Sequence, residues 1–218
     1  LLAENSCGCE LAVIEGVMGY YDGLGLTSTR ASTFELAQKT ESPVVLVVNA
    51  RGAALSVLAA IQGFLQFRPE SGIQGVILNG CTAMSYGALA AELARRFSIK
   101  ACGYLPRLPD CALESRHLGL VTAQEVSDLK EKMQRLARAA EQTLDFDALF
   151  AIAKSAPPLS FAPPELPKPG APVRVGVARD KAFCFFYEDS LALLRKLGAE
   201  LVDFSPLEDE TLPENLQG

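Results

Sequence analysis

The sequence is poor in histidine and has no closely paired C-x-x-C cysteines, two features on which many nucleophilic and metal sites are built. Its 218 residues include no tryptophan and one histidine, His117, and none of its six cysteines forms a C-x-x-C pair. A single histidine without a convincing partner serine or cysteine offers no visible catalytic triad. His117 is therefore better explained as a structural residue than as a base.

A strongly basic balance and a long hydrophobic run are also missing. The net charge is −6, whereas nucleic-acid binding usually needs a basic face. The longest aliphatic run, Val44–Val48, is far shorter than the roughly 20 apolar residues that cross a bilayer. No secretory signal pattern is visible at Leu1. We expect a cytoplasmic protein with neither nucleic acid nor membrane as a partner.

The cysteines are scattered, which at this chain length argues against a disulfide framework. Reduced, buried thiols are the expected state, and the alternative of a metal cluster rests only on Cys7-Gly8-Cys9. Cys184 lies among aromatic residues, a setting that favours an inert buried thiol over a low-pKa nucleophile.

Short apolar runs alternate with helical stretches along the first two thirds of the chain. This alternation predicts an α/β fold with a mostly parallel sheet and flanking helices. Such sheets bind ligands at the carboxyl ends of their strands. Ser32-Thr33-Phe34-Glu35 is a capping box that should open a helix to about Lys39. Pro43–Val48 is expected to be buried on both faces. The expected strands are Leu11–Glu15, Pro43–Val48, Ile73–Leu78 and Lys100–Tyr104, and the helices between them are Ala53–Phe67 and Ser85–Phe97.

The last third begins with helices and then changes composition. Thr122 and Glu125 form a second capping box, which should open an amphipathic helix to about Gln142, and a short helix is expected at 147–154. Seven of the thirteen prolines lie between Pro157 and Pro172, which favours a semi-rigid linker over a long surface loop. Strands at 173–178 and 201–204, with a helix at 190–197, would follow. We therefore expect an amidoligase-type domain at 1–154, a linker at 155–172 and the beginning of a second α/β domain at 173–218.

The segment Val13-Ile14-Glu15-Gly16-Val17-Met18-Gly19-Tyr20-Tyr21-Asp22-Gly23 carries the strongest chemical signal. A carboxylate at the end of a buried strand would point into the ligand crevice, and the glycines would let backbone approach a ligand closely. One carboxylate can hold a magnesium ion that is also bound to nucleotide phosphates. The alternative is a glycine-rich turn with two solvated acids, Glu15 and Asp22.

Two further segments follow predicted strands. Asn79 offers both a donor and an acceptor that could read a purine edge, although a turn residue is the simpler explanation. In Gly103-Tyr104-Leu105-Pro106-Arg107, Pro106 could pack on a base, and Arg107 could bind phosphate or carboxylate.

Taken together, these motifs resemble the cobyrinic acid a,c-diamide synthase family. The Glu15–Gly23 segment is similar to that family's signature, and the other matching motifs recur in the family's order. They are PVVLVVNARG (43–52), GVILN (75–79), GYLPR (103–107), RHLGLVTAQE (116–125), VARDKAFCFFY (177–187) and AELVDFSP (199–206).

The resemblance implies a P-loop NTPase domain of the dethiobiotin-synthetase type, followed by a glutamine amidotransferase domain. ATP would phosphorylate a side-chain carboxylate of a corrin ring, and ammonia from glutamine would displace the phosphate. Glu15 would then be a magnesium ligand and, with Asp22, a catalytic residue that places the substrate carboxylate or the phosphoryl centre.

By the same resemblance, the corrin side would be lined by Gly16, Gly19, Tyr20 and Tyr21. Asn79 and the Gly103–Pro106 segment would hold adenine, with Arg107 nearby.

The sequence departs from the family pattern in several places. It contains no G-x-x-x-x-G-K-[ST] phosphate loop and no G-x-C-x-G nucleophile elbow. Asn49 stands where an aspartate is expected, and Gly80-Cys81 follows Asn79 where an arginine is commoner. We expect the chain to be a piece of a longer enzyme and to show neither ATP hydrolysis nor glutaminase activity alone.

Three alternatives stay open at this point: cobyric acid synthase, sirohydrochlorin a,c-diamide synthase, and a non-amidating, P-loop-like positioning ATPase. The sequence shows no interface pattern that would indicate the oligomeric state. It also does not indicate which carboxylates react first.

Overall fold

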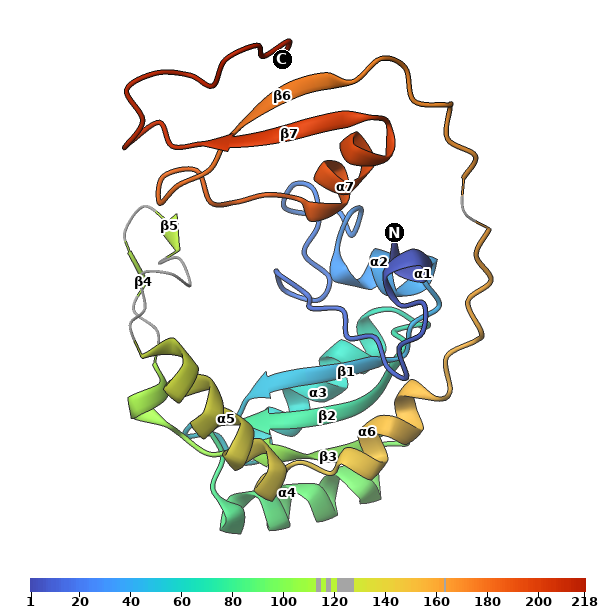
Figure 1. Cartoon of the computed structure of the whole chain (residues 1–218). Helices are drawn as coiled ribbons and strands as arrows, with labels where there is room; N and C mark the ends of the chain where they lie inside the picture. Colours follow the sequence, from blue (N-terminus) through green and yellow to red (C-terminus); the bar gives the residue numbers. More distant parts are fainter. Residues whose placement is uncertain (113–114, 117–118, 121–127, 163) are drawn as a thin grey trace. The chain divides into compact units, whose positions relative to one another are not determined.

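Parallel strands flanked by helices make up the chain, which confirms the predicted α/β class. The computed structural model describes residues 1–112, 115–116, 119–120, 128–162 and 164–218 (Figure 1). The chain divides into two compact units. The larger unit contains the described residues of Gly8–Glu114 and Asp128–Leu159, and the smaller one contains those of Leu1–Cys7, Ser115–Ser127 and Ser160–Gly218.

The larger unit is built on a parallel sheet of three strands in the order β1-β2-β3. These strands are β1 (Val44–Asn49), β2 (Ile73–Asn79) and β3 (Lys100–Leu105). Each parallel pair is joined by a crossover helix, α3 (Leu55–Phe67) after β1 and α4 (Ala83–Arg96) after β2. All five elements agree with the prediction to within two residues at each end. The carboxyl ends of all three strands therefore lie along one edge of the sheet.

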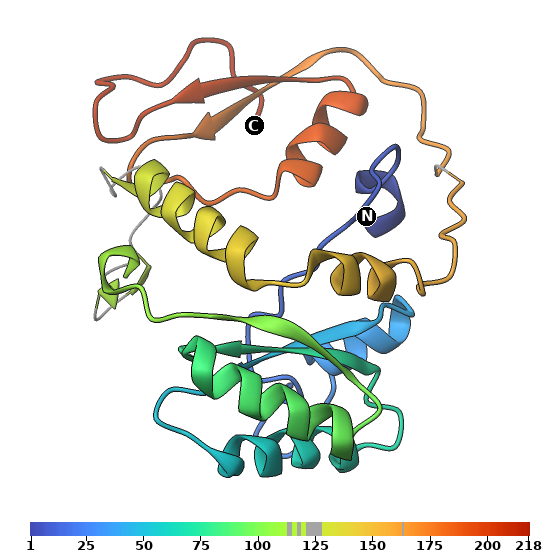
Figure 2. The same cartoon turned by 90° about the horizontal axis from the view of Figure 1, so that it is seen from below.

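Helices cover both faces of this sheet. Figure 2 shows α3 and α4 on one face and α5 (Leu129–Thr143) with α6 (Phe146–Ala153) on the other. The core between the sheet and the α3–α4 layer contains Ile61, Val76, Leu78 and Leu93, each almost completely buried. Burial of such aliphatic side chains contributes about 1.5–3 kcal/mol each, so this layer stabilises the frame that carries the strand ends.

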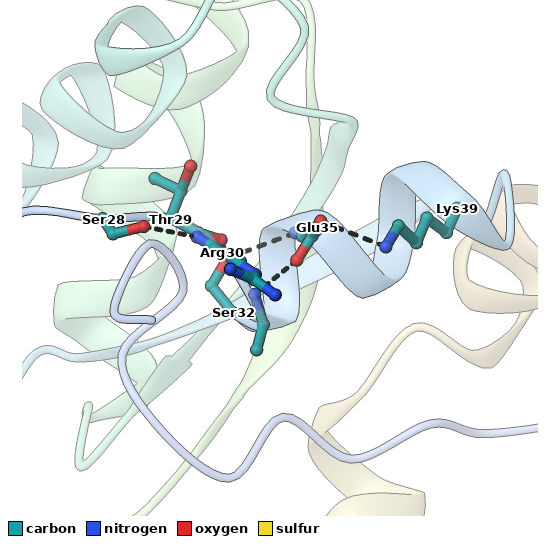
Figure 3. A network of polar contacts seen from close by, with 7 residues as sticks. Ser28, Thr29, Arg30, Ser32, Glu35 and Lys39 are labelled. Carbon is teal, nitrogen blue, oxygen red and sulfur yellow. Dashed lines mark hydrogen bonds and ion pairs between the residues drawn. The ribbon is translucent and has the colours of Figure 1, made fainter. Parts of the chain in front are cut away.

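The first helix of this unit, α2 (Thr33–Lys39), begins where the capping box predicts. Ser32 Oγ accepts a hydrogen bond from the Glu35 amide at 3.2 Å, and Ser32 is buried (Figure 3). The Glu35 carboxylate returns to the amide of Ala31, one residue earlier than in the standard capping box. Glu35 also pairs with Lys39 at 3.1 Å. The two acceptors satisfy backbone donors at and just before the helix start.

The smaller unit contains the parallel pair β6 (Val173–Ala178) and β7 (Ala199–Phe204), with α7 (Glu188–Lys196) between them in sequence. The short antiparallel pair β4 (Ser115–Arg116) and β5 (Gly119–Leu120) belongs to the same unit, as does α1 (Leu2–Asn5). Lys196 at the end of α7 pairs with Glu4 of α1 at 2.9 Å.

Two predictions about strands are wrong. Leu11–Glu15 forms no strand, and its apolar side chains lie in the open, with Val13 84% exposed. The β1 strand is not buried on both faces, because Val47 is 59% exposed. The predicted strand has no hydrogen-bonded neighbour among the described residues, so β1 is an edge strand of this sheet. The exposure of Val47 has a separate reason, because α5 and α6 pack mainly on β2 and β3.

Some predictions concern residues that the structure does not describe. His117, Thr122 and Glu125 lie outside the described residues, and so does most of the RHLGLVTAQE motif. Of the helix predicted to run from Thr122 to about Gln142, the structure describes the part that forms α5. A short 3-10 helix, η1 (Pro109–Cys111), follows β3. The described residues of 157–171 form neither helix nor strand. The domain boundaries at 154 and 172 remain predictions.

Candidate functional site

Glu15 stands in an irregular, exposed stretch of the larger unit. Residues 9–19 form no helix or strand and are exposed throughout. Gly16 lies against the start of α2, where an added Cβ would be 2.8 Å from the Thr33 side chain. The Glu15 carboxylate is thus presented to solvent next to a close backbone approach, and not from the end of a buried strand as predicted.

The second acid, Asp22, closes a tight turn. Its amide donates to the Gly19 carbonyl at 2.9 Å, with Tyr20 and Tyr21 as the central residues. The Asp22 carboxylate folds back over Gly19 so closely that any Cβ at Gly19 would overlap Oδ2. Gly19 is therefore required for the place that this carboxylate takes. Gly23, directly after it, lies against the carbonyls of Ser28 and Arg30, which leaves no room for a side chain there either.

Tyr20 and Tyr21 point away from solvent and into the unit. Tyr20 is 6% exposed and packs with Leu46 and Ile73, and its hydroxyl donates to the Ser71 carbonyl. Burial, followed by the neighbouring Tyr21, raises the pKa of Tyr20 to about 12. Tyr21 is half-buried, and its hydroxyl donates to the Phe64 carbonyl at 2.6 Å. Burial raises its pKa as well, although the Arg68 charge opposes the rise. Both hydroxyls are therefore neutral donors to backbone near neutral pH.

The predicted nucleotide-side residues meet at the carboxyl ends of β2 and β3. Asn79 ends β2 and pairs with Leu105, the last residue of β3. Asn79 and Arg107 are exposed, and Pro106 is half-buried. The amides of Gly80 and Cys81 both donate to the Leu105 carbonyl, at 2.8 and 3.1 Å. The sheet thus brings Asn79 and the Pro106–Arg107 segment together, as the strand-end rule predicts.

Gly103 has a local structural reason to be glycine. Its φ is +108°, a conformation that disfavours side chains. An added Cβ would be 2.6 Å from Leu144 Cα, because the connection between α5 and α6 pairs with β3 at this point through an antiparallel bridge between Gly103 and Leu144. The residue therefore allows α6 to pack on the sheet, and any role at a nucleotide would be additional to that.

The turn that carries Asp22 (residues 19–22) and the strand-end residues Asn79, Pro106 and Arg107 lie near opposite ends of β2. The Tyr20 hydroxyl bonds to Ser71, just before β2 begins at Ile73, whereas Asn79 is the last residue of the strand. A strand rises about 3.3 Å per residue, which puts these two points on the order of 20 Å apart. Glu15 lies seven residues before Asp22, and no described hydrogen bond or ion pair joins the two acids.

The smaller unit has a cavity at the carboxyl ends of its own two strands. It measures about 320 Å³ and is lined by Arg179, Asp180, Lys181, Cys184, Phe186, Ser205 and Glu208. The predicted inert, buried Cys184 is in fact half-buried and faces this cavity. The Arg179 guanidinium lies over the Phe186 ring, 4.5 Å from its centroid. Its Nε is 3.1 Å from Asp203 Oδ2 but is not aligned for a hydrogen bond.

Asp180 organises the loop around this cavity, although it was not among the residues predicted for a site. One carboxylate oxygen accepts from the amides of Ala182 and Phe183, and the other accepts from Ser205 Oγ and the Leu207 amide. Burial alone would raise the pKa of this carboxyl, but the backbone and Ser205 hydrogen bonds outweigh it and lower the pKa. An aspartate placed two residues after a strand and directly before a turn was the available signal.

The remaining cysteines divide by position. Cys81, Cys102 and Cys111 are buried as predicted, but Cys7 and Cys9 are exposed. Among the described residues, no group of three or more histidine, cysteine or acidic side chains is arranged to hold a metal ion. None of the described helices is long and apolar enough to cross a bilayer.

Comparison with known proteins gives one consistent result. No family profile and no solved structure matches the chain. Curated proteins named cobyrinate a,c-diamide synthase do match it along nearly all of its length. The protein from Listeria monocytogenes serotype 4b is 38% identical over 216 residues, which cover 98% of this chain and 48% of the relative.

Two further relatives extend the comparison. The protein from Priestia megaterium is 37% identical over 220 residues, covering all of this chain and 48% of the relative. The one from Gloeobacter violaceus is 42% identical over 207 residues, covering 93% and 45%. The chain spans about half the length of these curated relatives.

The fold defines an α/β protein with parallel strands flanked by helices. The comparisons make the assignment specific: the chain is a relative of the cobyrinate a,c-diamide synthases, and the resemblance predicted from its motifs is confirmed.

Proposed function

We propose that this chain is part of an enzyme that amidates the a and c side-chain carboxylates of cobyrinic acid, with ATP as the energy source and glutamine as the nitrogen donor. The observation that supports this most strongly is 37–42% identity to proteins named for that reaction along 93–100% of the chain. The product belongs to cobalamin biosynthesis, and we propose a cytoplasmic location for the enzyme.

The chemistry has two balanced steps. A substrate carboxylate oxygen attacks the γ-phosphorus of ATP, which forms an acyl phosphate and releases ADP. Ammonia, set free when glutamine is hydrolysed to glutamate, then attacks the acyl carbon and expels phosphate, leaving the amide. The first step gains most from positioning and charge, since phosphoryl transfer asks little covalent chemistry of the protein.

Asp22 is the residue that we assign to the substrate carboxylate or to the phosphoryl centre. Its carboxylate is exposed and rests on Gly19 in a closed turn, so it has a defined place and access to a ligand. A group held in this way loses little conformational freedom when a substrate binds.

Glu15 is the residue that we assign to Mg²⁺. Magnesium prefers one or two carboxylates and completes its shell with phosphate oxygens and water. An exposed glutamate in an irregular stretch, followed by Gly16, offers such a carboxylate, so the residue fits the ion. Bound magnesium would neutralise charge on the nucleotide phosphates. Asn79, Pro106 and Arg107, together at the ends of β2 and β3, are assigned to the nucleotide.

The test is an assay of the full-length enzyme with ATP, glutamine and cobyrinic acid. We expect mass spectrometry to show stepwise replacement of carboxyl OH by NH₂ at two positions, dependent on both ATP and glutamine. A panel containing sirohydrochlorin and cobyrinic acid a,c-diamide separates the related amidases, because each would favour a different macrocycle. ATP hydrolysis without amide formation on any member of the panel would contradict the proposal and would point to a positioning ATPase.

A further inference from the structure

The turn that carries Asp22 is tied to the protein interior by two adjacent tyrosines. Tyr20 and Tyr21 lie at its two central positions, and the Asp22 amide closes it on the Gly19 carbonyl. A short exposed turn is usually one of the more mobile parts of a protein. This one differs, because both of its central side chains are anchored to backbone far away in sequence.

The two anchors reach separate carbonyls on the same side of the unit. The Tyr20 hydroxyl donates to Ser71, 51 residues away, and the Tyr21 hydroxyl donates to Phe64, 43 residues away, at 2.6 Å. Phe64 lies in the last turn of α3, and Ser71 lies in the connection that leads into β2. The turn is therefore fastened across the α3–β2 connection at two points.

Aromatic packing reinforces these bonds. The ring of Tyr21 contacts those of Phe34, Phe64 and Phe67, with centroids 5.2, 6.0 and 5.0 Å away. The Tyr20 ring meets Phe34 edge-on at 5.9 Å. The Phe34 amide also donates to the Tyr20 carbonyl at 2.9 Å, which joins the turn to the start of α2. Rings held on several sides in this way have little freedom to swing toward a ligand.

We propose that Tyr20 and Tyr21 are positioning residues, which fix the Asp22 carboxylate through the turn that they share with it, and that they do not contact the corrinoid. This inference rests on the proposed function, in which Asp22 acts at the reacting carboxylate. It replaces the earlier expectation that both tyrosines line the corrin side. Gly19 contributes to the same positioning, because the Asp22 carboxylate lies directly against this first residue of the turn.

The test compares Tyr20→Phe and Tyr21→Phe in the full-length enzyme, since each change removes one hydroxyl and keeps the ring. We expect kcat for amide formation to fall at least about 10-fold, because small displacements of a catalytic group are costly. The KM for the corrinoid and the glutaminase rate should stay within twofold of the unchanged enzyme. A raised corrinoid KM at unchanged kcat would mean that the tyrosines contact the substrate, and it would overturn the proposal.

Tyr86→Phe is the matched control. The Tyr86 hydroxyl also donates to a backbone carbonyl, that of Ala101 at 3.2 Å, and its ring stacks on Tyr104. It therefore reports what loss of such a bond costs when no acid turn is attached. If Tyr86→Phe lowers kcat as much as the other two variants do, the fall in kcat is explained by general destabilisation, and the proposal is overturned.

Hydrogen exchange gives a readout that does not depend on amidation. Amides of residues 19–23 should exchange faster in Tyr20→Phe and Tyr21→Phe than in Tyr86→Phe. Unchanged exchange there would overturn the positioning role even in an active enzyme. If exchange rises as expected but the unchanged enzyme amidates no corrinoid, the proposed function fails and the anchoring of the turn stands. Because Tyr21 is half-buried, its variant keeps the test decisive should Tyr20→Phe fail to fold.

Discussion

The carboxylate of Asp22 lies directly over the α-carbon of Gly19, in the space that any Cβ at that position would occupy. The two residues also share the hydrogen bond that closes their turn, from the Asp22 amide to the Gly19 carbonyl at 2.9 Å. The Asp22 carboxylate can therefore take this position only because residue 19 has no side chain. This feature connects a glycine in the sequence motif to the proposed chemistry.

Substitution of Gly19 tests this relationship. In Gly19→Ala the new methyl group must displace the Asp22 carboxylate, so we expect kcat for amidation to fall at least about 10-fold in the full-length enzyme. The control is Gly170→Ala, in which no atom lies within 4 Å of the added Cβ and φ is not positive, and it should leave kcat unchanged. Full activity of Gly19→Ala would show that the place of Asp22 is not needed.

Replacement of the proposed magnesium ligand separates the two half-reactions. Glu15→Gln keeps the size of the side chain and removes its charge, so synthesis should fall by roughly 100-fold or more. Glutaminase activity should persist, because it needs no nucleotide phosphate. The measurement is glutamate release and amide formation in the same reaction mixture. Equal loss of both activities would argue against the magnesium role.

The N-cap of α2 should contribute measurably to stability. Ser32→Ala removes the acceptor for the Glu35 amide, and we expect the free energy of unfolding to fall by about 1 kcal/mol. Ser56→Ala on the exposed face of α3 is the comparison and should change it little. Urea unfolding followed by circular dichroism measures both. Equal values for the two variants would contradict the capping role.

A substitution in the interior of α4 should raise the free energy of unfolding. Gly87 lies within this helix and has no atom within 4 Å of an added Cβ. Gly87→Ala should raise the free energy of unfolding by about 0.4–1 kcal/mol, since alanine restricts the unfolded chain and favours helix. A lower stability in urea unfolding would show that the helix is packed there.

The Tyr20 hydroxyl should make stability depend on alkaline pH. Burial raises its pKa from 10.0 to about 12 in the folded chain. Between those values the folded state keeps a proton that the unfolded state has lost, so the free energy of unfolding falls as pH rises. The contribution is complete below pH 10 and is lost as pH rises through about 12. Urea unfolding at a series of pH values should show a shallower decline for Tyr20→Phe, and parallel declines would contradict this account.

The sequence predicted those parts of the fold that follow from local patterns. The apolar runs of β1, β2 and β3, the Ser32 cap and the helices α3 and α4 all appear close to the expected bounds. Each of these depends on neighbours in sequence or on simple alternation. The strand expected at Leu11–Glu15 failed because a strand also needs a partner along its edge, and no local pattern shows whether that partner is present.

The sequence predicted where some of the candidate residues lie but not how the two tyrosines are oriented. Asn79 and Pro106 were expected to meet because parallel strands end at one edge, and they do. The inward direction of Tyr20 could not be read from the sequence, since two tyrosines beside a glycine and an acid are equally compatible with a ligand surface. Their partners, the carbonyls of Phe64 and Ser71, are backbone atoms and leave no signal in residue type.

The most direct test of the central claim follows the oxygen atoms of the substrate. Cobyrinic acid labelled with ¹⁸O in its side-chain carboxylates is incubated with the full-length enzyme, ATP and glutamine, and the released phosphate is analysed by mass spectrometry. An amidoligase that activates the carboxylate as an acyl phosphate must transfer one labelled oxygen to phosphate for each amide formed. Phosphate free of label, with ATP consumed, would contradict the account.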